Sequence, residues 1–135
     1  MLTPDYATFA QLAAQGTHIP VAREFLFDCD TAVTAYHKLR QPPFGFLLES
    51  LVGGEKWARY TFLGTAPRSA WRLDTGGRIS TWTPAHGWSE TRIAPDPLAE
   101  LDALLRAATP VAVPGLPRFF GGAVGYLGYD VIRYI

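Results

Sequence analysis

This sequence of 135 residues has a single cysteine, no long apolar run and no excess of either charge. Its single cysteine, Cys29, excludes an internal disulfide and a zinc site built from several cysteines. A chain so poor in cysteine suits a reducing compartment, so we expect a cytoplasmic protein. The apolar runs are too short, or too broken by proline, to span a bilayer, and Met1–Tyr6 does not resemble a signal peptide. We therefore expect no membrane partner.

Acidic and basic residues balance each other, at 12 of each, so the formal net charge is zero. A protein that binds nucleic acid or an anionic membrane through general electrostatic attraction carries a basic excess. We therefore expect no nucleic-acid partner. Any ligand must be recognised by a few local side chains.

Motifs of catalysis and cofactor binding are also lacking. The glycines between Gly121 and Gly128 form neither Gly-x-Gly-x-x-Gly nor a P-loop, so close packing of the backbone is the better interpretation. The three histidines, His18, His37 and His86, lie far apart and have no partner at metal-ligand spacing. No serine lies in a Gly-x-Ser-x-Gly elbow. We predict that this chain contains no catalytic, cofactor-binding or metal-binding residue.

Hydrophobic periodicity predicts an alternation of short helices and strands. Helices are expected at residues 5–14, 31–39 and 97–107, with Thr3 and Asp30 as the N-caps of the first two. Strands are expected at residues 19–27, 44–50, 59–64, 69–73, 78–83 and 88–93, separated by breaks typical of hairpins. We predict an α+β fold in which helices pack against a mainly antiparallel sheet.

The most informative polar residues follow the apolar run that ends at Leu48. If the segments 46–50 and 59–63 pair as a hairpin, Arg59 lies near Glu49 and Ser50. Such a trio suits a zwitterionic ligand, because Glu49 can bind an ammonium, Arg59 a carboxylate and Ser50 either group. An ordinary strand end, or a surface ion pair between Glu49 and Arg59 that contributes at most about 1 kcal/mol, explains the same spacing. Spacing alone leaves these alternatives open.

Four motifs occur together: Leu47-Leu-Glu-Ser50, Gly53-Gly-Glu55, Arg59-Tyr-Thr-Phe-Leu-Gly64 and Gly121-Gly-Ala-Val-Gly-Tyr126. In combination they resemble the N-terminal region of anthranilate synthase component I, in the chorismate-utilising enzyme family, over nearly the whole chain. The chain departs from the family pattern at Thr61, often serine, and Ala58, often glycine. Aminodeoxychorismate synthase component I, of the folate pathway, shares much of the pattern and is one alternative. A free-standing small-ligand binding module is another.

The resemblance implies that residues 1–135 form the N-terminal domain of a larger enzyme core. The apolar end at Ile135 leads us to expect a fragment, whose own C-terminal chorismate-binding portion lies outside this sequence. The full-length protein would be a lyase of tryptophan biosynthesis that uses Mg²⁺ to convert chorismate and ammonia to anthranilate and pyruvate. A glutamine amidotransferase subunit, component II, would supply the ammonia.

The resemblance also implies feedback inhibition by L-tryptophan. Four residues match the positions that line the inhibitor site in the family: Leu48, Glu49, Ser50 and Arg59. Because the family places its chorismate and magnesium residues in the missing portion, we expect this region to be regulatory and structural. The fragment alone is expected to be non-catalytic.

Overall fold

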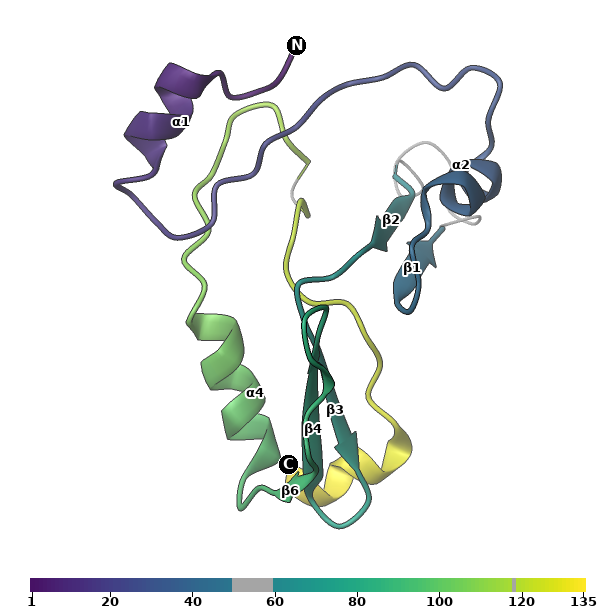
Figure 1. The fold of residues 1–135 in the computed structure, drawn as a ribbon, viewed down its shortest axis with the longest axis vertical. Coiled ribbons are helices and arrows are strands. Elements are labelled where there is room, and N and C mark those ends of the chain that lie inside the picture. Colours follow the sequence, from purple (N-terminus) through teal and green to yellow (C-terminus); the bar gives the residue numbers. More distant parts are fainter. Residues whose placement is uncertain (50–59, 118) are drawn as a thin grey trace. The chain divides into compact units, whose positions relative to one another are not determined.

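The computed structural model describes residues 1–49, 60–117 and 119–135. Four helical segments are present in this part of the chain: α1 (Tyr6–Leu12), α2 (Ala32–Leu39), α4 (Pro97–Arg106) and the 3₁₀ helix η1 (Tyr129–Tyr134). The strands are β1 (Gly45–Leu48), β2 (Phe62–Thr65), β3 (Ala70–Asp74), β4 (Arg78–Thr83), β5 (Gly87–Trp88) and β6 (Arg92–Ile93). The predicted α+β class is confirmed (Figure 1).

Two sheets carry these strands. The first pairs β1 with β2, and the second has the order β3-β4-β5, with β6 also paired to β4. Three strand pairs are antiparallel: β1–β2, β4–β5 and β4–β6. The chain divides into two compact units, of which the first comprises residues 1–25, 71–80 and 90–135 and the second residues 26–70 and 81–89. None of the described helices is long and apolar enough to cross a membrane.

The first unit contains the buried core. Its buried apolar side chains are Ile79, Ala94, Val111 and Val113. Helix α4 begins with Asp96 as N-cap, whose carboxylate accepts a hydrogen bond from the Ala99 amide at 2.9 Å. The Arg92 guanidinium on β6 binds both carboxylate oxygens of Glu100 on α4, and this hydrogen bonding lowers the pKa of Glu100. The strand and the helix are thereby held together.

Helix α1 is shorter than predicted and has a different cap. The carboxylate of Asp5 accepts a hydrogen bond from the Thr8 amide at 2.8 Å, so Asp5 and not Thr3 is the N-cap. Thr3 instead exchanges two backbone hydrogen bonds with Ala22, at 2.8 and 2.7 Å. A carboxylate three residues before an amide is a favourable cap, and it shifts the helix start by two residues.

The prediction of a strand at residues 19–27 is wrong. In the structure this segment takes part only in single bridges, Thr3 with Ala22 and, just before it, His18 with Pro110. Alternating apolar residues indicated a strand, but a ladder also needs a partner with regular amides. One of the bridge partners is a proline, which has no amide to donate.

The strand predicted at residues 88–93 is interrupted and forms β5 and β6. The Thr81 amide of β4 donates to the hydroxyl of Ser89 at 3.1 Å, and the Ser89 amide donates to the Thr81 carbonyl at 2.7 Å. A side-chain hydroxyl therefore replaces one carbonyl of the backbone ladder. Competition of this kind between serine and regular structure is common, and it ends the strand locally.

The glycine-rich tail does not confirm the close packing that the sequence predicts. Among the described residues, no heavy atom lies within 4 Å of a Cβ built on Gly121, Gly125 or Gly128. The following residues expose large apolar side chains, with Tyr126 93%, Tyr129 89% and Ile135 92% accessible. The glycines of this segment therefore leave open space around the backbone.

Candidate ligand site at the end of strand β1

The hairpin predicted around the Leu-Leu-Glu-Ser motif is confirmed for its described residues. Strands β1 and β2 pair antiparallel, with Leu48 opposite Phe62, Leu47 opposite Leu63 and Gly45 opposite Thr65. Because side chains alternate along a strand, this register assigns every residue of the hairpin to one of two faces.

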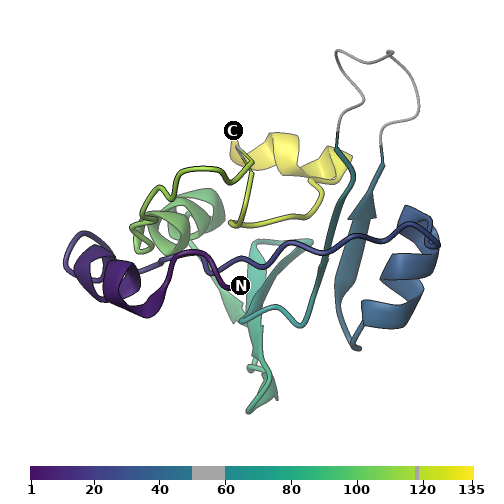
Figure 2. The same cartoon turned by 90° about the horizontal axis from the view of Figure 1, so that it is seen from above.

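One face of the hairpin is turned toward helix α2. It carries Gly45 and Leu47, with Leu63 and Thr65 across from them. A Cβ built on Gly45 would lie 2.5 Å from the hydroxyl oxygen of Tyr36, which places the Tyr36 side chain of α2 over this glycine. Figures 1 and 2 both show α2 alongside the two strands. The helix therefore covers this face.

The connection from α2 into β1 is fixed from two sides. The hydroxyl of Thr65 accepts a hydrogen bond from the Gln41 amide at 2.6 Å and donates to the Gln41 carbonyl at 3.2 Å. Just before β1, the Phe44 ring meets the rings of Trp82 and Trp88 edge-on, with centroid distances of 4.9 and 5.9 Å. Edge-to-face aromatic pairs of this kind contribute about 0.5–1.5 kcal/mol beyond their buried area. They hold the start of β1 in place.

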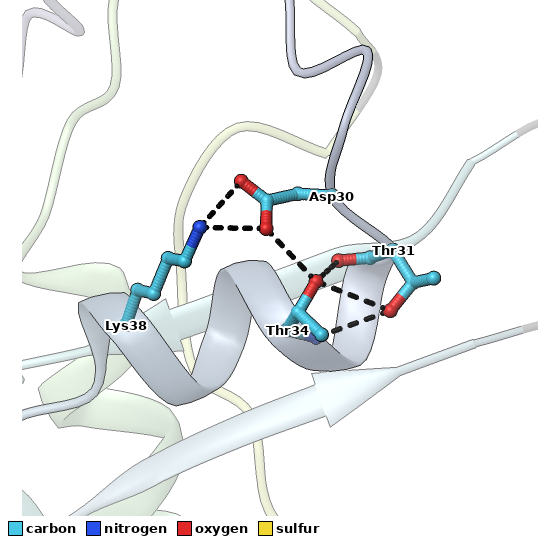
Figure 3. A network of polar contacts seen from close by, with 4 residues as sticks. All are labelled: Asp30, Thr31, Thr34 and Lys38. Carbon is cyan, nitrogen blue, oxygen red and sulfur yellow. Dashed lines mark hydrogen bonds and ion pairs between the residues drawn. The ribbon is translucent and has the colours of Figure 1, made fainter.

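Helix α2 is itself fastened at its start (Figure 3). Thr31 is the N-cap, and its hydroxyl accepts a hydrogen bond from the Thr34 amide at 3.2 Å. The prediction that Asp30 caps this helix is wrong. Asp30 instead binds the Lys38 ammonium through both carboxylate oxygens, at 2.7 and 2.9 Å, and accepts a bond from the Thr34 hydroxyl at 3.1 Å. The Lys38 hydrogen bond lowers the pKa of Asp30.

The second face of the hairpin is apolar and partly accessible. We call it the open face, and it consists of Phe46, Leu48, Tyr60 and Phe62. Leu48 is 49% and Tyr60 is 54% exposed, whereas Phe46 and Phe62 are half-buried. The rings of Tyr60 and Phe62 lie 5.9 Å apart in a tilted arrangement. The open face therefore presents apolar and aromatic side chains, which are the usual lining of small-molecule sites.

The structure describes two of the four residues of the predicted inhibitor site. Leu48 is the last residue of β1 and lies on the open face. Glu49 follows it directly and is exposed. Ser50 and Arg59 lie outside the described residues. The expectation that they lie close to Glu49 stays a prediction.

Sequence reasoning did not single out two aromatic residues of the open face, Tyr60 and Phe62. They belong to the same Arg-Tyr-Thr-Phe-Leu-Gly motif that supplied Arg59, and Phe62 is the cross-strand partner of Leu48. The alternation of the motif was a usable signal, because Tyr60 and Phe62 are two residues apart and share a face. The register needed to bring them to Leu48 was not evident from the sequence.

The described ranges contain no group of three or more His, Cys, Asp or Glu side chains placed to hold a metal ion. The binding of Mg²⁺ by the full-length enzyme stays a prediction. The described residues of this candidate site are thus the apolar side chains of the open face and the exposed Glu49, which follows Leu48 in the chain.

Comparison with known proteins gives relatives that are named anthranilate synthase component 1. The chain is 40% identical over 136 residues to anthranilate synthase component 1 of Synechocystis, which covers all of this chain and 26% of that protein. It is 44% identical over 130 residues to the component 1 of Pseudomonas aeruginosa and 42% identical over 128 residues to that of Pseudomonas putida. Each of these two matches covers 94% of this chain and 26% of the relative.

The chain thus spans about a quarter of the length of the curated relatives it matches. No family model matches it, and no solved structure matches it significantly. The resemblance that the four motifs indicated is confirmed along nearly the whole chain.

Proposed function

We propose that this chain, similar throughout to anthranilate synthase component 1, is the regulatory and structural N-terminal region of such an enzyme. The single observation that carries the proposal is the similarity of 40–44% identity over 94–100% of the chain to a quarter of each relative. A similarity that covers the whole of a short chain and a small part of a longer one is expected of one region in a larger protein. The full-length protein is then a cytoplasmic lyase of tryptophan biosynthesis.

The proposed regulation is feedback inhibition by L-tryptophan at the end of β1. The open face offers apolar surface to the indole ring, and Glu49, which follows Leu48 in the chain, is the proposed partner of the ammonium group. Arg59 is the proposed partner of the amino-acid carboxylate, and Ser50 can bind either group. The proposal thus assigns a partner to each of the three parts of the ligand.

The proposed partners and cofactor follow from the family. A component 2 glutamine amidotransferase supplies ammonia, and Mg²⁺ binds in the C-terminal chorismate-binding portion. The role of residues 1–135 is to carry part of the inhibitor site and to support that portion, with no catalytic residue of their own.

The proposal is tested with the full-length protein that contains this chain. Chorismate, ammonia and Mg²⁺ are supplied, and anthranilate is measured by its fluorescence over a series of tryptophan concentrations. We expect anthranilate formation that falls with added tryptophan. Formation of an aminodeoxychorismate product instead would identify the folate-pathway relative and overturn the proposal.

The purified chain of 135 residues is the matched control. We expect it to form no anthranilate above background under the same conditions, because this region contributes no acid/base pair or metal ligand to the chemistry. Turnover by the fragment would contradict the assignment of catalysis to the missing portion. Tight tryptophan binding by the fragment, with a full-length protein that lacks chorismate turnover, would favour a ligand-binding module.

A further inference from the structure

The interior of strand β2 contains a glycine that its backbone conformation does not require. Gly64 lies outside the left-handed region, so any residue can adopt its backbone angles. Glycine within a strand lowers stability, because it loses more conformational freedom on folding and packs no side chain. A reason other than backbone geometry must therefore account for it.

The reason is the ring of Phe46. Gly64 is the cross-strand partner of Phe46, and the aromatic ring lies over the space that a side chain at position 64 would occupy. A Cβ built on Gly64 would lie 2.7 Å from Cζ and 3.1 Å from Cδ1 of the ring, with Cε1 nearer still. Real Cβ atoms do not approach other heavy atoms so closely, so even alanine requires the ring to move. An aromatic ring packed over a strand glycine in this way stabilises the pair.

The direction in which the ring can move is set by the hairpin. Phe46 shares the open face with Leu48, whose side chain is 49% exposed, whereas α2 and Tyr36 lie against the other face. A ring lifted from Gly64 therefore enters the surface next to Leu48. This is the surface on which the indole of tryptophan is proposed to lie.

We infer that Gly64 and Phe46 act as a positioning pair: the missing side chain at Gly64 lets the Phe46 ring lie flat and keeps the open face free for an aromatic ligand. The inference rests on the tryptophan site proposed above. It adds two residues that set the shape of that site without a role in catalysis.

The test uses the full-length protein with the Gly64→Ala substitution, and tryptophan is the probe. We expect the half-inhibitory tryptophan concentration to rise about ten-fold, an effect typical of overpacking beside a tight site. Binding of radiolabelled tryptophan in equilibrium dialysis should weaken in parallel. Without tryptophan, kcat and the KM for chorismate should stay within about two-fold of wild type, since surface changes away from a reaction centre have small effects.

Rescue distinguishes this mechanism from a loss of folding. Phe46→Leu removes the ring atoms that approach position 64 while it keeps an apolar side chain. Combined with Gly64→Ala, it should return the half-inhibitory concentration to within about three-fold of wild type, half of the shift on a logarithmic scale. If Gly64→Ala alone fails to fold, recovery of folding and inhibition in the double variant supports the same contact.

Gly45→Ala is the matched control, because it makes the same change in the paired strand on the opposite face. Its Cβ would meet the hydroxyl end of the Tyr36 side chain, which can swing away, and would lie 3.1 Å from the carbonyl oxygen of Gly64, a contact that a shift of a few tenths of an ångström relieves. Inhibition should therefore stay within about two-fold of wild type. A ten-fold effect in this control would overturn the claim that the open face is what matters.

The remaining outcomes separate the two proposals. A wild-type enzyme that neither binds nor responds to tryptophan overturns the proposed function and this inference with it. Inhibition of the wild type that Gly64→Ala leaves unchanged overturns the inference alone. Equal loss of kcat without tryptophan, or no recovery in the double variant, shows that Gly64 is a residue of general structural importance and not a positioning residue.

Discussion

The two compact units differ in whether they fully bury any apolar side chain among their described residues. The first unit buries Ile79 to 1% exposure and Ala94 to 4%. Among the described residues of the second unit, none is fully buried, and Leu48 and Tyr60 remain about half exposed. Burial contributes about 25 cal/mol per Å² of apolar surface, so the side chains of this core stabilise the first unit. The described side chains of the second unit stay partly or largely accessible.

The difference is also one of sheet size. A two-stranded hairpin is marginally stable in water by itself, whereas several strands with a buried face are stable. The β1–β2 hairpin is supported instead by the Tyr36 contact, the Thr65–Gln41 hydrogen bonds and the Phe44 cluster. The hairpin is thus held in position by contacts with residues outside its own two strands.

The contrast is tested most strongly at two isoleucines. Ile79→Ala should lower the free energy of unfolding by about 2–5 kcal/mol, because it leaves a cavity in the core. Ile93, 73% exposed, is the matched control, and Ile93→Ala should cost less than about 1 kcal/mol. Urea unfolding of the two variants measures both values. Equal losses would mean that the first unit has no distinct core.

The proposed tryptophan site is tested by a change at Ser50. Ser50→Phe in the full-length protein should fill space that the ligand needs and weaken tryptophan binding by about 1–3 kcal/mol, roughly ten-fold to a hundred-fold. Chorismate turnover without tryptophan should persist. Activity is measured against tryptophan concentration for both proteins. An unchanged curve would show that Ser50 is an ordinary residue at a strand end.

A smaller change, in this case an increase in the free energy of unfolding, is expected for a substitution at Ser80 in the first unit. Its hydroxyl is buried at 3% exposure and has no hydrogen-bond partner among the described residues. Ser80→Ala should raise the free energy of unfolding by about 1 kcal/mol, because a buried hydroxyl without a partner is unfavourable. Ser89→Ala is the control and should lower it by about 0.5–1.5 kcal/mol, since the Ser89 hydroxyl accepts the Thr81 amide bond. Thermal unfolding that ranks the two variants the other way contradicts this account.

The smallest expected change in stability depends on pH, and it comes from loss of the Asp30 charge at the start of α2. The pKa of Asp30 is lowered from 3.8 by its hydrogen bond with Lys38. Its contribution to stability is therefore present above the pKa of the unfolded chain and is lost as the pH falls through the lowered folded value. At pH 6 the Asp30→Asn variant should have a lower melting temperature than wild type. This difference in melting temperature should disappear toward pH 2. Asp28→Asn serves as the control, and a gap that persists at pH 2 would contradict the role of the carboxylate charge.

Local signals in the sequence were sufficient for the elements that depend on neighbouring residues. Helix α4 follows from the proline at its first position, the spacing of its leucines and the acidic residue before it. The pairing of β1 with β2 follows from two apolar runs, one on each side of a glycine-containing break. The Leu-Leu-Glu-Ser and Arg-Tyr-Thr-Phe-Leu-Gly motifs also sufficed to identify the relatives.

Tertiary structure decided what depends on distant partners. Residues 19–27 alternate like a strand but lack a ladder, because strand formation needs the hydrogen bonds of a second segment. Asp30 lies where a cap is expected, but Lys38, eight residues away, binds its carboxylate. Phe62 joins Leu48 only through the register of the hairpin. The motifs thus indicated the resemblance and local spacing indicated most of the regular elements. Register and packing decided which side chains share a surface, because those contacts join residues far apart in the chain.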